Sequence, residues 1–344
     1  MTNTPDAPIS DLVSTVIDYR GKTPKKSDTG IPLITAKVIK DGRITNSRAE
    51  FIPTDSYSSW MRRGLPEVRD ILVTTEAPLG EVAQITTTDR VALAQRVILL
   101  RPNPAQVEPQ FLFHFLRSPE GRARMQERSS GTTVSGIRQP ELLAVRVPLL
   151  DRRQQATAAA LLDALDDLIA TNERRIELLE DLARSLYREW FARFRFPGQP
   201  ADAGRPADWS EQRLGEIAAV VSDGIDPSEV AADTPYCGLE HLPRRSTTLR
   251  DWASVDSVSS RKLRFQEGDT LFGKIRPYFH KVAWSPFDGV TSSDAMVFRP
   301  TGPISAPALL ATILASDEVV VNRKRKVQSF PEANSAEVGR TRRP

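Results

Sequence analysis

Polar and basic side chains gather in short segments beside predicted strands, and their types are those that bind nucleic acid. They are Lys22, Lys25, Thr75, Gln95, Arg96, Ser130, Thr132, Thr133 and Arg138 in the first half of the chain, and Lys274, Arg276, Tyr278 and Ser293 in the second. Arginine and lysine bind phosphates or guanine edges, while serine, threonine and glutamine can reach either. A solvated surface position is the alternative for each residue alone. As a set they predict loops that contact DNA.

Catalytic and metal-binding patterns are absent from the sequence. The chain has three scattered histidines, His114, His241 and His280. The single cysteine, Cys237, excludes an intramolecular disulfide and a multi-cysteine zinc site, and its strand-like context predicts a buried filler residue. Gly268–Lys274 resembles a phosphate-binding loop, but Ile275 replaces the magnesium-binding hydroxyl and Pro277 would break the next helix. The sequence therefore predicts a binding protein without catalytic residues, metal or cofactor of its own.

The composition is that of a soluble globular protein, with 40% hydrophobic and 26% charged residues among 344. There is no apolar run of membrane-spanning length and no signal-peptide pattern, so we expect a cytoplasmic protein with no membrane partner. The net charge is only +3, and residues 323–344 alone hold 7 basic and 2 acidic residues. Net charge by itself therefore does not predict DNA binding.

An internal repeat of about 200 residues determines the expected architecture. The segment Asp70–Ala83 matches Asp269–Ala283, with eight residues from the aspartate to a proline in both copies. Each copy then closes on an apolar run that ends in Arg101-Pro102 or Arg299-Pro300. Different polar residues precede these runs, as expected if two domains read different bases on one scaffold. The chain therefore contains two similar domains.

Each copy mixes strand and helix signals. Ile71–Thr75 and Arg96–Leu100 are apolar runs typical of buried strands, and Phe111–Leu116 follows a proline helix start. Ser129–Gly136 is a polar turn segment. We predict an α+β fold in which two repeated domains, each a mixed sheet with short helices, are joined by a long coiled-coil-type helix.

That helix is predicted from Arg152 to about Arg195, where neither glycine nor proline occurs. Its apolar stripe, at three- and four-residue steps, comprises Leu161, Leu165, Leu168, Asn172, Ile176, Leu179, Leu182 and Leu186. A helix of about 65 Å cannot bury such a stripe within one small domain, so the stripe predicts a partner. Asn172 is the type of residue that fixes coiled-coil register. Packing of the stripe along its own domain is the alternative.

These features predict the domain boundaries. The segments are 1–150 (first domain), 151–198 (spacer and docking helix), 199–208 (linker), 209–322 (incomplete second domain) and 323–344 (basic tail). We interpret the tail as non-homologous and disordered, with a DNA-binding arm as the alternative.

Several strings in one order resemble the specificity subunit of type I restriction–modification enzymes. They are Gly30-Ile-Pro-Leu-Ile, Asp70-Ile-Leu-Val, Ala94-Gln-Arg, Ser130-Gly-Thr-Thr, Gln154-Gln155 with Leu161-Leu-Asp163, and Trp190-Phe191. The resemblance covers roughly residues 9–321. It implies two target recognition domains, each reading one half of a bipartite site in double-stranded DNA, and a helix that docks methyltransferase subunits.

The same resemblance implies that chemistry belongs to partner subunits. S-adenosylmethionine, ATP and Mg would bind to the methyltransferase and restriction/translocase subunits. A complete family member has a second long helix, which has no counterpart here, so the stripe also predicts self-association through the long helix. The alternatives are a nuclease or methyltransferase that acts alone, and a coiled-coil assembly protein without DNA readout.

Overall fold

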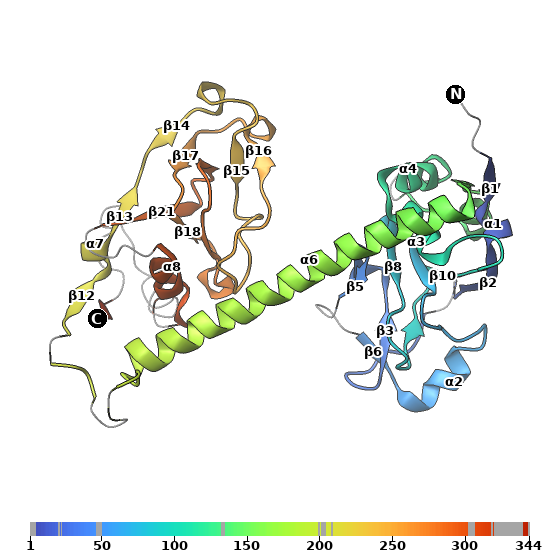
Figure 1. The fold of residues 1–344 in the computed structure, drawn as a ribbon, viewed down its shortest axis with the longest axis horizontal. Coiled ribbons are helices and arrows are strands. Elements are labelled where there is room, and N and C mark those ends of the chain that lie inside the picture. The colour runs from blue at the N-terminus through green and yellow to red at the C-terminus, as the bar shows by residue number, and fades with distance from the viewer. Residues whose placement is uncertain are drawn as a thin grey trace. The chain divides into compact units, whose positions relative to one another are not determined.

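The computed structural model describes residues 5–19, 21, 23–45, 50–131, 135–198, 200, 204–207, 209–301, 307–317, 319 and 340–342. The chain forms two compact units, which we call the first unit (Met1–Ile169) and the second unit (Ala170–Pro344). Their strands and helices are labelled in Figure 1.

The first unit is built on an antiparallel sheet with the strand order β2-β10-β7-β8. Its strands are β2 (Val13–Asp18), β10 (Val97–Pro102), β7 (Ile71–Thr75) and β8 (Leu79–Gln84). Alternation along β7 and β10 sends Ile71 and Ile98 into one hydrophobic core and Leu72 and Leu99 into another. Both faces of the sheet are therefore covered, which explains why all residues of β7 are buried.

Short helices cover one face of this sheet and a smaller sheet covers the other. The helices on the first face are α1 (Ile9–Leu12), α3 (Pro109–Arg117), α4 (Pro119–Glu127) and α5 (Gln139–Leu143), whereas α2 (Tyr57–Trp60) packs on the side of the smaller sheet. The smaller sheet has the order β6 (Glu50–Ile52), β3 (Ile31–Ile34), β9 (Ala92–Leu93), and β3 runs parallel to β9. Two further pairs are β1 (Asp6–Pro8) with β11 (Arg146–Pro148), and β4 (Ile39–Lys40) with β5 (Arg43–Ile44).

The second unit repeats this plan. Its antiparallel sheet has the order β13 (Ala218–Val221), β21 (Ala295–Pro300), β18 (Thr270–Gly273), β19 (Val282–Trp284). Its other sheet is β14 (Gly224–Ile225), β17 (Lys262–Phe265), β20 (Gly289–Thr291), β15 (Pro235–Cys237), β16 (Ala253–Ser254), with helices α7 (Leu214–Ile217) and α8 (Pro307–Ala315). Since β15 runs parallel to β20 as β3 does to β9, the predicted α+β repeat is confirmed.

The repeated Asp and Arg make the same ion pair in both units. Arg101 donates from Nε and Nη2 to the two carboxylate oxygens of Asp70, both at 2.8 Å. Arg299 does the same to Asp269 at 2.8 and 2.7 Å. Both aspartates are 1% exposed and also accept a backbone N–H, from Glu67 or Gln266. The motif found in the sequence is therefore a structural clamp between neighbouring strands.

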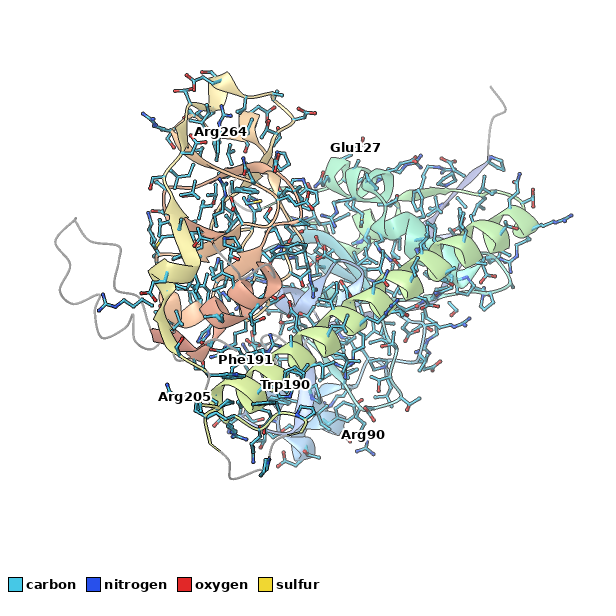
Figure 2. The ribbon with its side chains drawn as sticks, turned by 60° about the vertical axis from the view of Figure 1, so that its left-hand side comes forward. Arg90, Glu127, Trp190, Phe191, Arg205 and Arg264 are labelled. Atoms are coloured by element: carbon cyan, nitrogen blue, oxygen red, sulfur yellow. The ribbon has the colours of Figure 1, made fainter. Side chains whose placement is uncertain are left out.

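The long helix α6 (Arg152–Tyr187) begins in the first unit and ends in the second, followed by a π-helical turn, Arg188–Ala192. Trp190 and Phe191 lie in that turn (Figure 2), where the Phe191 ring stacks on Trp209 with centroids 5.6 Å apart. Residues Gln155 and Ala159 are its buried positions, so most of α6 is solvent-exposed.

Polar side chains of α6 contact both units. In the first unit Arg117 forms a bidentate ion pair with Asp166, and His114 Nε2 lies 2.8 Å from Asp163 Oδ1. In the second unit Glu180 Oε1 accepts from the Ser246 hydroxyl at 2.8 Å and from the Thr248 N–H at 3.0 Å. Of the apolar stripe, Ile176 and Leu179 line a pocket with Trp284 and Ala311 of the second unit, while most of its leucines stay exposed.

Of the predicted tail 323–344, only Arg340–Arg342 lie within the described residues. They form strand β22, which pairs antiparallel with β12 (Glu211–Arg213). The expectation of disorder is wrong at these three residues, because pairing with β12 gives their backbone groups hydrogen-bond partners.

Candidate nucleic-acid interface

Residues from four separate segments of the first unit surround one pocket of about 330 Å³, here called the first-unit pocket. Its lining is Gly21, Thr75, Glu76, Gln95, Arg96, Ser130, Gly136, Ile137 and Arg138. Five of these were predicted from sequence as DNA contacts: Thr75, Gln95, Arg96, Ser130 and Arg138. The fold therefore brings together predicted residues that are far apart in the chain.

Backbone hydrogen bonds around Thr75 hold three of these four segments in place. The Thr75 N–H donates to the Arg96 carbonyl at 3.0 Å, and the Thr75 carbonyl accepts from the Ile137 N–H at 2.9 Å. Ser130 and Gly136 exchange two backbone hydrogen bonds, both 2.9 Å long. The loop tips are thus fixed by main-chain contacts, which leaves the side chains available for a ligand.

Thr75 itself belongs to this framework and not to the exposed surface. Its side chain is only 1% exposed, because it is the last residue of the buried strand β7. A threonine side chain buried to that extent cannot reach a DNA base or phosphate. The prediction of Thr75 as a direct contact is therefore wrong, although its backbone positions Arg96 and Ile137.

The exposed side chains of the pocket are mostly hydrogen-bond donors. Arg96, Ser130 and Arg138 are exposed, and Gln95 is partly buried, with its Oε1 accepting from the Thr23 hydroxyl at 3.3 Å. Lys25 is exposed but is not part of the pocket lining. The predicted contacts Lys22, Thr132 and Thr133 lie outside the described residues.

Glu76 also faces this pocket, although among the residues of the candidate segment Thr74–Ala77 only Thr75 was predicted as a DNA contact. Its Oε1 lies 2.8 Å from Nε of Arg96, and its backbone bridges to Gly136. The sequence did contain a signal, since Glu76 directly follows a predicted strand and Arg96 directly precedes the next one. If those two strands pair antiparallel, the two side chains meet at the same sheet end.

In the second unit the predicted residues lie on the equivalent turns. Lys274 follows β18, its N–H donates to the Asp294 carbonyl at 2.8 Å, and its Nζ donates to the Ser293 carbonyl at 2.7 Å. Lys274, Arg276, Tyr278 and Ser293 are all exposed. The Lys274 ammonium is held beside Ser293, as Arg96 is held beside Glu76. These residues therefore form a second exposed polar cluster.

Cys237 is buried, as predicted, and burial raises the pKa of its thiol to about 12. The thiol is therefore protonated at neutral pH. Within the described residues, no group of three or more His, Cys, Asp or Glu side chains is arranged to hold a metal ion. None of the helices in that part of the chain combines the length and apolar character that a bilayer crossing requires.

The predicted docking residues form a solvent-exposed apolar surface on α6. Leu161, Leu165, Leu168, Leu179 and Leu182 are between 48 and 62% exposed. Leu186 and Asn172 are exposed as well, and Ile176 is partly buried. Large exposed apolar surfaces of this kind mark interaction sites.

Comparison with known families gives one matching domain model. Residues 11–181 match the type I restriction modification DNA specificity domain. The chain is 26% identical over 183 residues to the type I restriction enzyme MjaIX specificity subunit of Methanocaldococcus jannaschii, covering 50% of this chain and 42% of that protein. It is 24% identical over 219 residues to the EcoDI specificity subunit of Escherichia coli, covering 56% and 49%.

A longer match extends to the putative MjaX specificity subunit of Methanocaldococcus jannaschii, 23% identical over 289 residues, covering 81% of this chain and 68% of that protein. The chain spans less than half the length of the first two relatives. Among solved structures, the S subunit of a type I restriction–modification system from M. genitalium is similar, with a TM-score of 0.58 at 15% identity over 100% of this chain and 86% of that one. That similarity concerns the fold.

Proposed function

Because the chain belongs to the family of type I restriction modification DNA specificity proteins, we propose that it binds double-stranded DNA and selects the site on which partner subunits act. The observation that carries this proposal is the convergence of Gln95, Arg96, Ser130 and Arg138 on one exposed pocket. Arginine, glutamine and serine are the side chains that read base edges or hold phosphates.

In this proposal each unit reads one half of a bipartite site. Two sheets with the same strand order present loops at equivalent positions, while the side chains on those loops differ. Two units with the same fold but different loop side chains are suited to reading two different half-sites. The first-unit pocket and the cluster around Lys274 and Arg276 are the two proposed contact regions.

The apolar stripe of α6 would dock methyltransferase subunits. Burial of one leucine side chain contributes about 1.5–3 kcal/mol, so the exposed leucines of α6 offer a strong association surface. S-adenosylmethionine, ATP and Mg would then be held by the partner subunits, with the restriction/translocase subunit joining through the complex. The assembled protein would work in the cytoplasm, where the DNA is.

The test is to co-express the full chain with its methyltransferase subunits and to sequence the methylated positions in host DNA. We expect one bipartite motif that disappears when this chain is omitted. DNA cleavage or methylation by the purified chain alone, with magnesium or methyl donor, would establish the stand-alone enzyme instead. A complex that forms but shows no sequence preference would favour a coiled-coil assembly protein.

A further inference from the structure

We propose that Glu76 and Arg96 act as one reading unit for a G·C base pair, Arg96 contacting the guanine and Glu76 the cytosine amino group. This inference rests on the proposed function and deepens it, because it names the base pair that the first-unit pocket selects. Glu76 becomes a specificity-determining residue, beyond the basic and neutral side chains that the sequence pointed to.

The ion pair with Glu76 leaves the two terminal nitrogens of the Arg96 guanidinium available to bind a base. Nε of Arg96 is engaged by Glu76 Oε1 at 2.8 Å, while the two side chains stay 47% and 40% exposed. Among the described residues no hydrogen-bond partner of the two terminal nitrogens of Arg96 is found. Those two nitrogens form the planar fork that binds N7 and O6 of guanine together.

The Glu76 carboxylate favours a base over a phosphate as the ligand of the first-unit pocket. A phosphate site needs donors and positive charge, and a glutamate within 2.8 Å of its arginine would repel the phosphate. The major-groove edge of a G·C pair, in contrast, offers two acceptors on guanine and one amino donor on cytosine. An arginine fork beside a carboxylate is complementary to that edge, because glutamate accepts from cytosine N4.

The backbone around the pair keeps both side chains in place before DNA arrives. The Arg96 carbonyl accepts from the Thr75 N–H, and the Glu76 backbone bridges to Gly136. Gly136 also lies against the Glu76 side chain, because a Cβ atom there would be in van der Waals contact with it, 3.4 Å from Glu76 Cβ and 3.5 Å from Glu76 Oε2. A preorganised side chain loses less entropy on binding, which favours a specific contact.

The second unit has neither member of the pair at the equivalent positions. Counting from the repeated aspartates places Ile275 where Glu76 stands, and the β10 and β21 registers place Asp294 where Arg96 stands. The same base pair cannot be read there by the same two side chains. We therefore expect this G·C requirement in one half-site only.

The experiment uses the full chain in complex with its methyltransferase subunits. Binding is measured by competition between duplexes that carry each of the four base pairs at every position of the wild-type half-site. Arg96→Ala and Glu76→Gln should each reduce the preference for G·C at one and the same position by about 5- to 150-fold, and leave the other positions unchanged. The control is Arg90→Ala, an exposed arginine outside the pocket lining, which should leave the preference at that position intact.

A double variant separates reading from a merely structural role. Glu76→Arg combined with Arg96→Glu keeps an ion pair at the same place, and its folding is checked by thermal denaturation. Loss of the G·C preference in this folded variant supports the proposal, whereas an unchanged preference overturns it. Uniform weakening on all duplexes by Arg96→Ala, with a shallower salt dependence, would also overturn it, because Arg96 would then be a phosphate contact.

Failure of this inference is distinguishable from failure of the proposed function. A wild-type complex that selects a half-site without any required G·C pair overturns the Glu76–Arg96 assignment alone. A wild-type complex with no sequence preference overturns the proposed function, and this inference with it.

Discussion

The turn after β7 in the first unit and the turn after β18 in the second share a backbone hydrogen bond to the neighbouring strand end but carry different charged side chains. The Thr75 N–H donates to the Arg96 carbonyl at 3.0 Å, and the Lys274 N–H donates to the Asp294 carbonyl at 2.8 Å. Ala77 and Arg276, each just before the repeated proline, both have positive φ values, 46° and 51°. At the start of the neighbouring strand, the first unit thus presents Arg96 where the second presents Asp294.

The difference teaches that the fold keeps the framework separate from the recognition surface. The ion pairs Asp70–Arg101 and Asp269–Arg299 join the paired strands in the same way, at the strand ends opposite the two turns. The sequence of the turns can therefore change without loss of the sheet. Binding specificity can therefore diverge between two units of one architecture. The two units also differ in how they hold α6, with an ion pair in one and neutral donors in the other.

The largest effect is expected from a change that involves both units, on the stripe of α6. Replacing Leu168, in the first unit, and Leu179, in the second, by aspartate should abolish co-purification with methyltransferase subunits. The two leucines are 56 and 62% exposed, and their burial in a complex would contribute about 3–6 kcal/mol together. Affinity co-purification of wild type and double variant measures this. Complex at wild-type yield would reject the docking role.

Without a methyltransferase partner, the same stripe should be covered by a second copy of the chain. We expect the wild-type chain to self-associate or to be poorly soluble at micromolar concentration. The Leu168→Asp/Leu179→Asp variant should be the more soluble form and a monomer in light scattering. A monodisperse wild-type monomer would contradict self-association, while the co-purification result would still stand on its own.

The next largest effect is expected at the clamps, which should respond equally in the two units. Asp70→Ala leaves Arg101 beside a buried gap, and Asp269→Ala does the same to Arg299. Removal of one partner of a fully buried pair costs about 3–5 kcal/mol, and each loss should be smaller here because Arg101 and Arg299 are 23 and 37% exposed. Urea denaturation with limited proteolysis identifies the unit that unfolds. Loss in only one unit would show that the two clamps are not equivalent.

The sequence predicted the two repeated sheets better than the arrangement of the candidate DNA contacts. The reason is that the sheets follow local patterns, whereas the contacts join residues far apart in the chain. Asp70 and Arg101 belong to one local strand pattern that recurs as Asp269 and Arg299, so the repeat is visible without a structure. The approach of Ser130 and Arg138 to Arg96 depends on backbone bonds to Thr75, and no local pattern encodes these. The burial of Thr75 was not predicted, because a polar side chain gives no sign that both faces of strand β7 are covered.

A smaller effect, on DNA specificity and not on the stability of the fold, is expected from substitutions at Arg96 and Asp294. Arg96→Ala should relax one position of one half-site by about 1–3 kcal/mol, and Asp294→Ala should change only the other half-site. Neither side chain is buried, so the melting temperature should change little. Sequencing of the methylated sites of both variants measures the effect. Relaxation of the same half-site by both variants would contradict the assignment of one half-site to each unit.

The smallest effect concerns the two attachments of α6. Burial raises the pKa of Glu180, but hydrogen bonds from Ser246 and Thr248 outweigh it and hold the pKa below its ordinary value. The pKa of Asp166 is lowered chiefly by its hydrogen bond to Arg117. Since both folded-state pKa values are depressed, the stability they contribute is present above the unfolded-state values, about 4, and is lost as the pH falls through the folded-state values.

Salt should distinguish the two attachments, because the first is a close bidentate ion pair and the second is made chiefly by neutral donors, with Arg184 at 3.7 Å from the Glu180 carboxylate. Added salt screens Arg117 and Asp166, which are both 29% exposed, whereas neutral donors hold Glu180, which is 11% exposed. Glu180→Gln keeps an acceptor of the same shape and should cost about 1 kcal/mol, a cost that is independent of salt and is lost as the pH falls through the lowered pKa of Glu180. Asp166→Asn should cost less as salt is added. Thermal denaturation across pH and salt measures both, and a salt-dependent cost at Glu180 would mean that Arg184, 3.7 Å from its carboxylate, is its effective partner.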